Sequence, residues 1–235
     1  MSLPSTPSQI HAADSARKMR FWNWIARRYA ANAIADQAGY ETTLQRVREL
    51  LNTEHEVLEL GCGTGSTALR LAPHTARLLA TDLSPAMLVI ARERLQAQPR
   101  PQLEFALADV DGPDFESARY DRVLAFNLLH LSADLDQTLA TVVRTLRPSG
   151  LLISKTPCLG ELNPLITRPL ALLMRVLRAV GRAPHMRFLD EAQLSAAMQR
   201  AGLQLLASER HGTRGKDMRA FIVARKPAEA QAALT

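Results

Sequence analysis

Three glycines at alternate positions, Gly61, Gly63 and Gly65, follow a glutamate, Glu59, within the stretch 57–72. The residues before the glycines contain no breaker and predict a short buried strand. Those after them have the apolar spacing of a helix. Glycines let a backbone approach a ligand closely, and the first N–H groups of a helix attract anionic groups. The stretch therefore predicts a turn that binds the polar tail of a ligand.

The spacing of the glycines separates classes of ligand. A dinucleotide fingerprint is G-x-G-x-x-G, and its third glycine would fall at Ser66. The observed G-x-G-x-G, with an acid two residues before it, is similar to the first motif of class I S-adenosylmethionine-dependent methyltransferases, which places Cys62 beside the cofactor. Alone, the pattern also fits a turn with no ligand. A nicotinamide-dependent oxidoreductase is a further alternative, which the missing third glycine disfavours. We expect Ser66 or Thr67 to cap the helix.

A second acid, Asp82, ends an apolar strand about 20 residues after the first glycine, the offset at which a βαβ unit places a carboxylate on a ribose. It can accept hydrogen bonds from both ribose hydroxyls; a helix cap with no ligand is the alternative. The sequence D-x-S-P-x-M-L that starts here closely resembles the second methyltransferase motif, which adds Leu83 and Met87 to the cofactor site. The resemblance also implies that Asp109 and Val110, after a third strand, face the adenine amino group.

The fourth expected strand, 120–126, is followed by Asn127. In open α/β sheets ligands bind at the carboxyl ends of the strands, where the strand order reverses, so we expect Asn127 and Leu128 to border the transferred methyl group. Base-methylating enzymes of this class usually carry Asn/Asp-Pro-Pro-aromatic here, whereas this chain has Asn-Leu-Leu-His. The sequence therefore disfavours transfer to a nucleobase amino group. His130 could be a general base or a structural histidine at a helix start.

Aromatic residues concentrate in an expected helix over 16–35, although the whole chain has only 5% aromatic residues. The run from Trp22 to Tyr29 resembles the D-x-x-A-x-x-Y opening of the ubiquinone-biosynthesis and phospholipid-methylating branches, with Asn23 in place of the aspartate. The resemblance makes Tyr29 a candidate catalytic residue together with His130. These aromatic side chains could instead pack the N-terminal helices on the sheet, or one could line a pocket beside the sulfonium cation.

The segment 165–182 departs from a minimal methyltransferase. It is apolar with interleaved arginines, and no acid falls between Glu161 and Asp190. A basic amphipathic segment can be a lid over the acceptor, a membrane-surface helix, or a helix packed on the body. We expect a lid whose apolar face lines a hydrophobic substrate pocket, with peripheral membrane contact as the alternative.

The motifs fall in the family's order and imply one α/β domain over 1–235. The resemblance gives it a Rossmann-like, doubly wound, mainly parallel sheet of seven strands in the order 3-2-1-4-5-7-6. We expect a loose tail at 1–15, a turn at 147–150, and a final helix that begins at Asp190 and ends at Gly202. The domain divides into N-terminal helices, a cofactor-binding core, a lid insertion, and a C-terminal helix with a closing hairpin, at 1–50, 51–160, 161–187 and 188–226.

Composition narrows the class of protein. The chain has 235 residues, a formal net charge of +6 and 47% hydrophobic residues, which is ordinary for a globular protein. Two cysteines, Cys62 and Cys158, cannot form a metal site alone and suit a reduced, cytoplasmic setting. Residues 1–20 have no apolar core and predict no signal peptide. The positive charge is compatible with an anionic partner or with a solvated surface.

The sequence thus predicts an S-adenosylmethionine-dependent methyltransferase that acts on a small-molecule or lipid-like acceptor, at oxygen or nitrogen, by direct displacement of the methyl group. S-adenosylhomocysteine would be the product of the cofactor. For this chemistry the protein mainly aligns the reacting atoms and excludes water. A hydroxyl or a protonated amine would also need a base, for which His130, working with Tyr29, is the candidate. The alternatives are an RNA methyltransferase and a noncatalytic S-adenosylmethionine-binding protein. Nucleic acid is not the favoured partner, and we expect a monomer or a homodimer.

Overall fold

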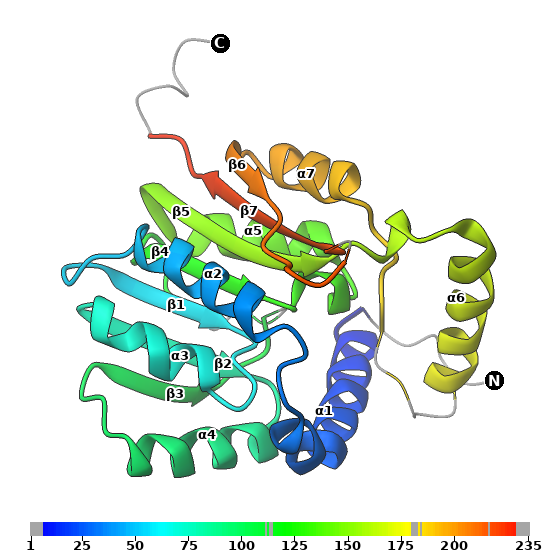
Figure 1. The fold of residues 1–235 in the computed structure, drawn as a ribbon, viewed down its shortest axis with the longest axis horizontal. Coiled ribbons are helices and arrows are strands. Elements are labelled where there is room, and N and C mark those ends of the chain that lie inside the picture. Colours follow the sequence, from blue (N-terminus) through cyan, green and yellow to red (C-terminus); the bar gives the residue numbers. More distant parts are fainter. Residues whose placement is uncertain are drawn as a thin grey trace.

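A computed structural model gives the fold and describes residues 7–110, 112, 115–179, 183, 185–215 and 217–228. Its centre is a sheet of seven strands in the order β3-β2-β1-β4-β5-β7-β6 (Figure 1). This order confirms the one expected from the resemblance. The expected tails beyond these residues, and Val180 and Arg182 of the expected lid segment, lie outside the described residues.

The first five strands are parallel, and β7 is antiparallel to both of its neighbours, β5 and β6. The turn expected at 147–150 lies inside β5: Tyr120 pairs with Leu146 but Arg122 pairs with Leu151, so the intervening residues form a bulge in which Ser149 has a φ of 64°. The closing hairpin is confirmed. The strands are β1 Glu56–Leu60, β2 Arg77–Asp82, β3 Leu103–Leu107, β4 Tyr120–Phe126, β5 Leu146–Pro157, β6 Gln204–Glu209 and β7 Arg219–Arg225.

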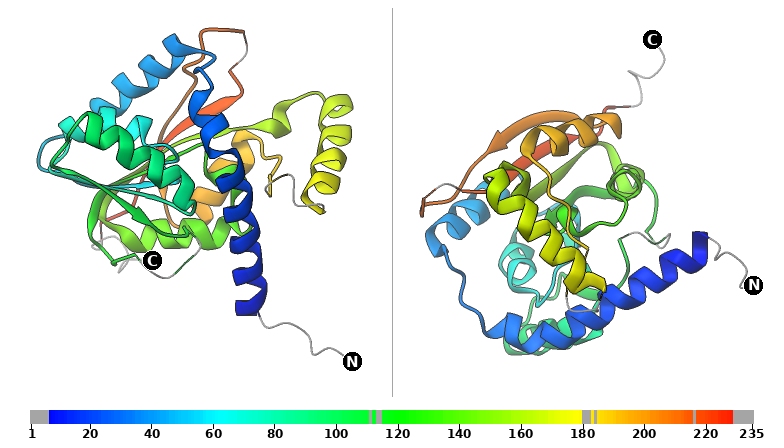
Figure 2. Two further views of the ribbon diagram at one scale, coloured as in Figure 1. Left: turned by 90° about the horizontal axis from the view of Figure 1, so that it is seen from below. Right: turned by 90° about the vertical axis from the view of Figure 1, so that its right-hand side faces the viewer.

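Helices cover both faces of the sheet (Figure 2). One buried cluster joins α2, α3 and α4 to the sheet, and the other joins α5 and α7 to its opposite face. The right-handed βαβ crossovers of a doubly wound fold give this three-layer arrangement. The helices are α1 Pro7–Ala31, α2 Gln37–Arg48, α3 Ser66–Leu71, α4 Pro85–Ala97, α5 Leu135–Thr145, α6 Pro164–Ala179 and α7 Glu191–Arg200, with 3₁₀ turns at Ala72–His74, Leu129–Leu131 and Leu159–Glu161.

Helix caps account for several boundaries. Asp190 accepts a hydrogen bond from the Gln193 backbone at 2.7 Å, and the Gln193 side chain accepts one from the Asp190 backbone, a complete capping box. The expected start of this helix is therefore confirmed. At its other end the C-cap residue is Ala201, one residue before the expected Gly202, which follows it with a φ of 87°. The expected cap of α3 is wrong. Its N-cap residue is Gly65, with a φ of 74° and no side-chain cap.

The expected loose tail at 1–15 is wrong for its described part, because α1 already begins at Pro7. This helix packs on α4 through Ala26, Met87 and Ile90, and the Ser15 hydroxyl donates a hydrogen bond to Asp109. Figure 1 shows α1 running beside the carboxyl ends of the central strands. The helix therefore forms one wall over the edge of the sheet where a ligand is expected.

Candidate functional site

The glycine turn after β1 is closely packed, which explains its composition. Gly61 and Gly65 have φ values of 67° and 74°, in the left-handed region that favours glycine. A Cβ at Gly61 would lie 2.8 Å from the Leu128 side chain, and one at Gly65 would lie 2.6 Å from Phe105. Both positions therefore need glycine for conformation and for space.

Asp82 ends β2 directly beside this turn. Its Oδ2 accepts a hydrogen bond from the Gly63 amide at 2.9 Å, and its Oδ1 accepts one from the Ser84 amide at 2.8 Å. Burial raises the pKa of Asp82, and the two amides oppose this shift. Each carboxylate oxygen keeps a further lone pair for a ligand hydroxyl.

Glu59 lies under the same turn and has a buried oxygen, Oε2, with no hydrogen-bond partner among the described residues. Burial raises the pKa of this carboxyl to about 8, and the neighbouring Asp82 adds to the effect. An unpaired buried carboxylate is costly unless a cation or a hydrogen-bond donor reaches it. The ammonium group of an amino acid tail meets that need, so the site fits a cofactor that carries one.

A first cavity, with about 850 Å³ of open space, lies between α1 and the carboxyl ends of β1, β2 and β4. From α1, Trp22 and Tyr29 face it, and their rings stand edge to face with centroids 6.3 Å apart. Its mixed lining of carboxylates and apolar side chains suits a nucleoside. The lining includes Lys18, Trp22, Tyr29, Gly61, Gly63, Thr81, Asp82, Leu83, Met87, Ala108, Asp109, Val110, Phe126, Asn127, Leu128, Leu131 and Ser132.

A second cavity, with about 1180 Å³ of open space, shares Tyr29, Phe126 and Asn127 with the first. It extends from the glycine turn, where Cys62 lines it, to Lys155 at the carboxyl end of β5. The two cavities therefore meet at a wall that both line, as expected for a cofactor site next to an acceptor site.

Asn127 occupies the meeting point in an unusual backbone conformation. Its φ is 53°, a region that asparagine tolerates better than most residues. Its amide donates a hydrogen bond of 2.8 Å to the Lys155 carbonyl, which ties the end of β4 to the end of β5. The side chain of Asn127 is exposed in the crevice.

The expected site residues fall into three groups. Gly61, Gly63, Asp82, Leu83, Met87, Asp109, Val110, Asn127 and Leu128 line the first cavity, with Tyr29 at both and Cys62 at the second. Glu59 and Gly65 support the turn from below without lining either cavity. His130 is the third case.

His130 lines neither cavity and is only 7% exposed. Its Nδ1 has no hydrogen-bond partner among the described residues, and its carbonyl accepts a bond of 2.7 Å from the Arg187 amide. Burial lowers the pKa of His130 to about 4. The ring is therefore neutral at physiological pH, and in this arrangement it faces no open space that a substrate reaches.

Sequence reasoning missed two cations of the second cavity, Lys155 and Arg219. Lys155 is one of the few charged residues in a buried strand, and that oddity was a usable signal. Arg219 comes from β7, which inserts beside β5 only in the folded sheet. Its place in the site could not be read from local spacing.

Comparison with known proteins shows which family model and which relatives the chain resembles. Residues 57–150 match a family model described as a methyltransferase domain. The chain is 34% identical over 142 residues to the iterative polyketide synthase afoE of Emericella nidulans, which covers 56% of this chain and 5% of that protein. It is 29% identical over 174 residues to the methyltransferase GfsG of Streptomyces halstedii, which covers 72% of this chain and 60% of that protein.

A solved structure of an S-adenosylmethionine-dependent methyltransferase from Mesorhizobium loti superposes with a TM-score of 0.64 at 22% identity, over 80% of this chain and 98% of that one. The chain spans only a small part of the polyketide synthase that it matches, and 60% of the length of GfsG. The residues that the family model matches, 57–150, include the glycine turn.

Proposed function

The chain carries a class I S-adenosylmethionine-dependent methyltransferase domain, and we propose that it methylates a small-molecule or lipid-like acceptor at oxygen or nitrogen. The observation that carries this proposal is Asp82, whose carboxylate keeps free lone pairs at the first cavity, next to a glycine turn that lies over the unpaired carboxyl of Glu59. A nucleoside with an amino acid tail suits this arrangement, and S-adenosylmethionine has this composition. Asp82 and Asp109, which line the cavity, would hold it, and Glu59 beneath the turn would attract its ammonium group.

The proposed reaction needs mainly alignment from the protein, and the proton that the acceptor oxygen or nitrogen loses on methylation leaves to solvent. When bound, S-adenosylmethionine supplies a methyl group that its positive sulfur already activates. Tyr29 and Asn127, which face both cavities, would orient the acceptor toward the first cavity and exclude water. Partial burial and the Asp82 carboxylate raise the pKa of Tyr29, so its hydroxyl stays protonated and donates a hydrogen bond. The proposed step does not use His130.

Calorimetry with S-adenosylhomocysteine and with NAD tests the cofactor. We expect the first to bind and the second to give no signal, because the third glycine of a dinucleotide turn is missing. Tight binding of NAD alone would overturn the proposal. A noncatalytic binding protein would bind S-adenosylhomocysteine yet transfer no labelled methyl group into any fraction of a cell extract.

The same labelled extract, divided into lipid, small-molecule and RNA fractions, tests the acceptor. We expect label in the lipid or small-molecule fraction, since Asn127 is not followed by a Pro-Pro-aromatic sequence. Faster methylation of purified RNA than of any small acceptor would favour the alternative of an RNA methyltransferase.

Helix α6 exposes leucines and arginines, and this surface favours a lipid-like acceptor that the protein meets at a membrane. No described residue of α6 lines either cavity, so the expected apolar lining of a substrate pocket by this segment is not seen. Its outer face exposes Leu165, Leu172 and Leu173, at 83%, 64% and 52%, with the exposed Arg168 and Arg175 along one edge. Leucines bordered by arginines suit the interface of an anionic membrane.

We therefore propose that α6 binds the surface of an anionic bilayer. The arginines of α6 supply the matching positive charge, and no acid lies between Glu161 and Asp190 to offset it. Among the described residues, no helix has both the length and the apolar character needed to cross a membrane, so the proposed contact is peripheral.

A further inference from the structure

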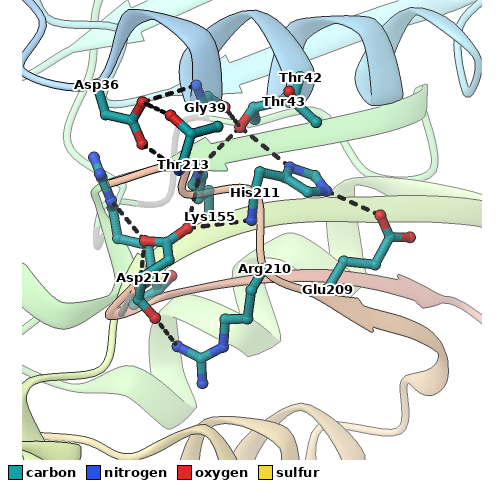
Figure 3. Close-up of polar contacts among 12 residues, drawn as sticks. Asp36, Gly39, Thr42, Thr43, Lys155, Glu209, Arg210, His211, Thr213 and Asp217 are labelled. Carbon is teal, nitrogen blue, oxygen red and sulfur yellow. Dashed lines mark hydrogen bonds and ion pairs between the residues drawn. The ribbon is translucent and has the colours of Figure 1, made fainter. Parts of the chain in front are cut away.

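The far end of the second cavity, away from the glycine turn, holds a cluster of charged groups (Figure 3). Lys155 belongs to β5, its ammonium group lies at this end of the cavity, and its side chain is 9% exposed. Its Nζ donates a hydrogen bond of 2.7 Å to the Thr43 hydroxyl of α2. Among the described residues Thr43 is the one hydrogen-bond acceptor of this ammonium group. Two of its three N–H groups are thus left for something else.

Arg219, at the start of β7, faces the same space. One carboxylate, Asp217, lies between the two cations: its Oδ2 is 3.9 Å from the Lys155 Nζ, and its Oδ1 accepts a bond of 3.3 Å from the Arg219 Nε. Asp217 does not line the cavity. Its oxygens also accept bonds from the backbone amides of His211 and Arg219, so it is already well occupied.

The other acid at this end, Asp36, lines the cavity but is occupied as well. It accepts hydrogen bonds from the Gly39 amide at 3.0 Å, the Thr213 amide at 2.8 Å and the Thr213 hydroxyl at 2.6 Å. These bonds hold the pKa of Asp36 well below its usual range. Both acids thus fix loops, whereas Lys155 and Arg219 present positive charge to open space.

The electrostatics of Lys155 reflect this arrangement. Burial lowers the pKa of Lys155, Asp217 opposes that shift, Arg219 adds to it, and Asp36 opposes it as well. Asp217 lies between the two cations but does not line the cavity, so an anion in the cavity would be attracted by both cations from the open side. Carboxylates and phosphates are the common anions that accept several charge-assisted hydrogen bonds at once.

We propose that Lys155 and Arg219 bind a negatively charged group of the methyl acceptor, a carboxylate or a phosphate, at the far end of the second cavity. This inference rests on the proposed function and adds the class of substrate. The Lys155 carbonyl accepts a hydrogen bond from the Asn127 amide, so the backbone of the residue that carries the ammonium group lies beside the point where the two cavities meet. A small acceptor could then place its anion on Lys155 and its nucleophile beside Asn127.

The test uses the full chain saturated with S-adenosylhomocysteine, with inorganic phosphate and acetate as probes in calorimetric titrations. We expect one or both probes to bind, with an affinity that falls as salt rises. Lys155→Met and Arg219→Gln should each weaken binding by about tenfold or more, as loss of a charge-assisted hydrogen bond does. The stronger probe identifies the anion. Binding of neither probe to the unaltered chain would overturn the proposal.

Matched controls remove the same charges elsewhere. Arg225 lies at the opposite end of β7 from Arg219 and bonds only Gln204 among the described residues, so Arg225→Gln is the control for Arg219→Gln. Lys226, the next residue, donates to the Leu146 carbonyl, so Lys226→Met is the control for Lys155→Met. Both controls should bind the probes as the unaltered chain does. If they lose binding as Lys155→Met does, the effect is one of net charge, and the site is wrong.

A second measurement separates the acceptor from the cofactor, whose amino acid tail also carries a carboxylate. Methylthioadenosine lacks that tail. If Lys155→Met weakens S-adenosylhomocysteine but not methylthioadenosine, Lys155 binds the cofactor and the inference fails while the proposed function stands. If the unaltered chain does not bind S-adenosylhomocysteine at all, the proposed function fails.

Discussion

Two helices with the same kind of apolar spacing have opposite fates in this fold. In α5 the apolar face is buried: Leu135, Leu139 and Val142 are 5%, 0% and 0% exposed. In α6 the comparable leucines, of which Leu165 and Leu172 are examples, remain largely exposed. Periodicity predicts that a helix has an apolar face, but it does not predict what covers that face.

Chain order explains the difference. Helix α5 connects β4 to β5, which are parallel neighbours, so the crossover must return across the sheet and pack on it. Helix α6 follows β5, but the chain returns to the sheet only through α7, which contacts α5, β6 and β7. Figure 1 and the left view of Figure 2 show α6 at the periphery, beyond the carboxyl end of β5.

The largest expected effect is the contrast in stability between these helices. Leu139→Ala in α5 should lower the free energy of unfolding by about 2–5 kcal/mol, because it opens a cavity in the core. Leu172→Ala in α6 should change it by about 0.5 kcal/mol or less, as for an exposed side chain. Denaturant unfolding of both variants measures this contrast. Equal losses would mean that α6 packs on the body and that the comparison is wrong.

The next effect concerns the cofactor. Asp82→Ala should weaken S-adenosylhomocysteine binding by about tenfold or more, since a charge-assisted hydrogen bond contributes roughly 1.5–3 kcal/mol. The double variant Leu172→Ser/Leu173→Ser should bind it as the unaltered chain does, because α6 lines neither cavity. Calorimetry distinguishes the two. Loss of affinity in the α6 variant would mean that α6 contributes to cofactor binding.

The third effect is the pH dependence of stability, which should come from the body rather than from α6. Glu59 has a raised pKa, about 8 against a usual 4.5, so between these values the folded chain holds a proton that the unfolded chain releases. Stability should therefore fall as pH rises from 4.5 to 8, by at most about 1.4 kcal/mol per pH unit.

Glu59→Gln should flatten this decline, and Leu172→Ser/Leu173→Ser should leave its slope unchanged. Unfolding curves collected at several pH values without cofactor measure both. An unaltered slope in Glu59→Gln would mean that this carboxyl is ionised in the folded chain and has found a partner.

Sequence reasoning succeeded where function depends on local spacing. The glycine turn, Asp82 at the end of β2 and the start of the last helix at Asp190 are each set by residues a few positions apart, and the structure shows all three. The α3 cap failed because Gly65, rather than a side chain, begins that helix. A left-handed glycine removes the need for a capping hydroxyl at Ser66.

It failed where distant segments meet. Lys155 and Arg219 share a cavity only because β7 inserts next to β5, and the burial of His130 follows from the segment that returns over it, where the Arg187 amide donates to its carbonyl. Neither arrangement leaves a mark in the spacing of neighbouring residues. The predicted surroundings of α6 were wrong for the same reason. The chain packs α7 rather than α6 on the sheet, and the sequence does not show which of the two helices is packed there.

The last comparison concerns the exposed face of α6 alone, its leucines and its arginines, and the arginine variants should give the smallest effect. If the outer face of α6 meets an anionic bilayer, Leu172→Ser/Leu173→Ser should abolish binding to vesicles that contain phosphatidylserine. Arg168→Gln and Arg175→Gln should each weaken that binding by about fivefold, since a basic residue near such a surface contributes about 1 kcal/mol.

Leu206→Ser removes a leucine that is 46% exposed on β6 and serves as the matched control; vesicle sedimentation should show no change for it. The unaltered chain and Leu206→Ser should bind neutral vesicles more weakly than anionic ones, and this difference should shrink in the arginine variants. If the leucine variant loses thermal stability together with binding, α6 is ordinary core. If all variants bind vesicles as the unaltered chain does, the membrane contact is wrong.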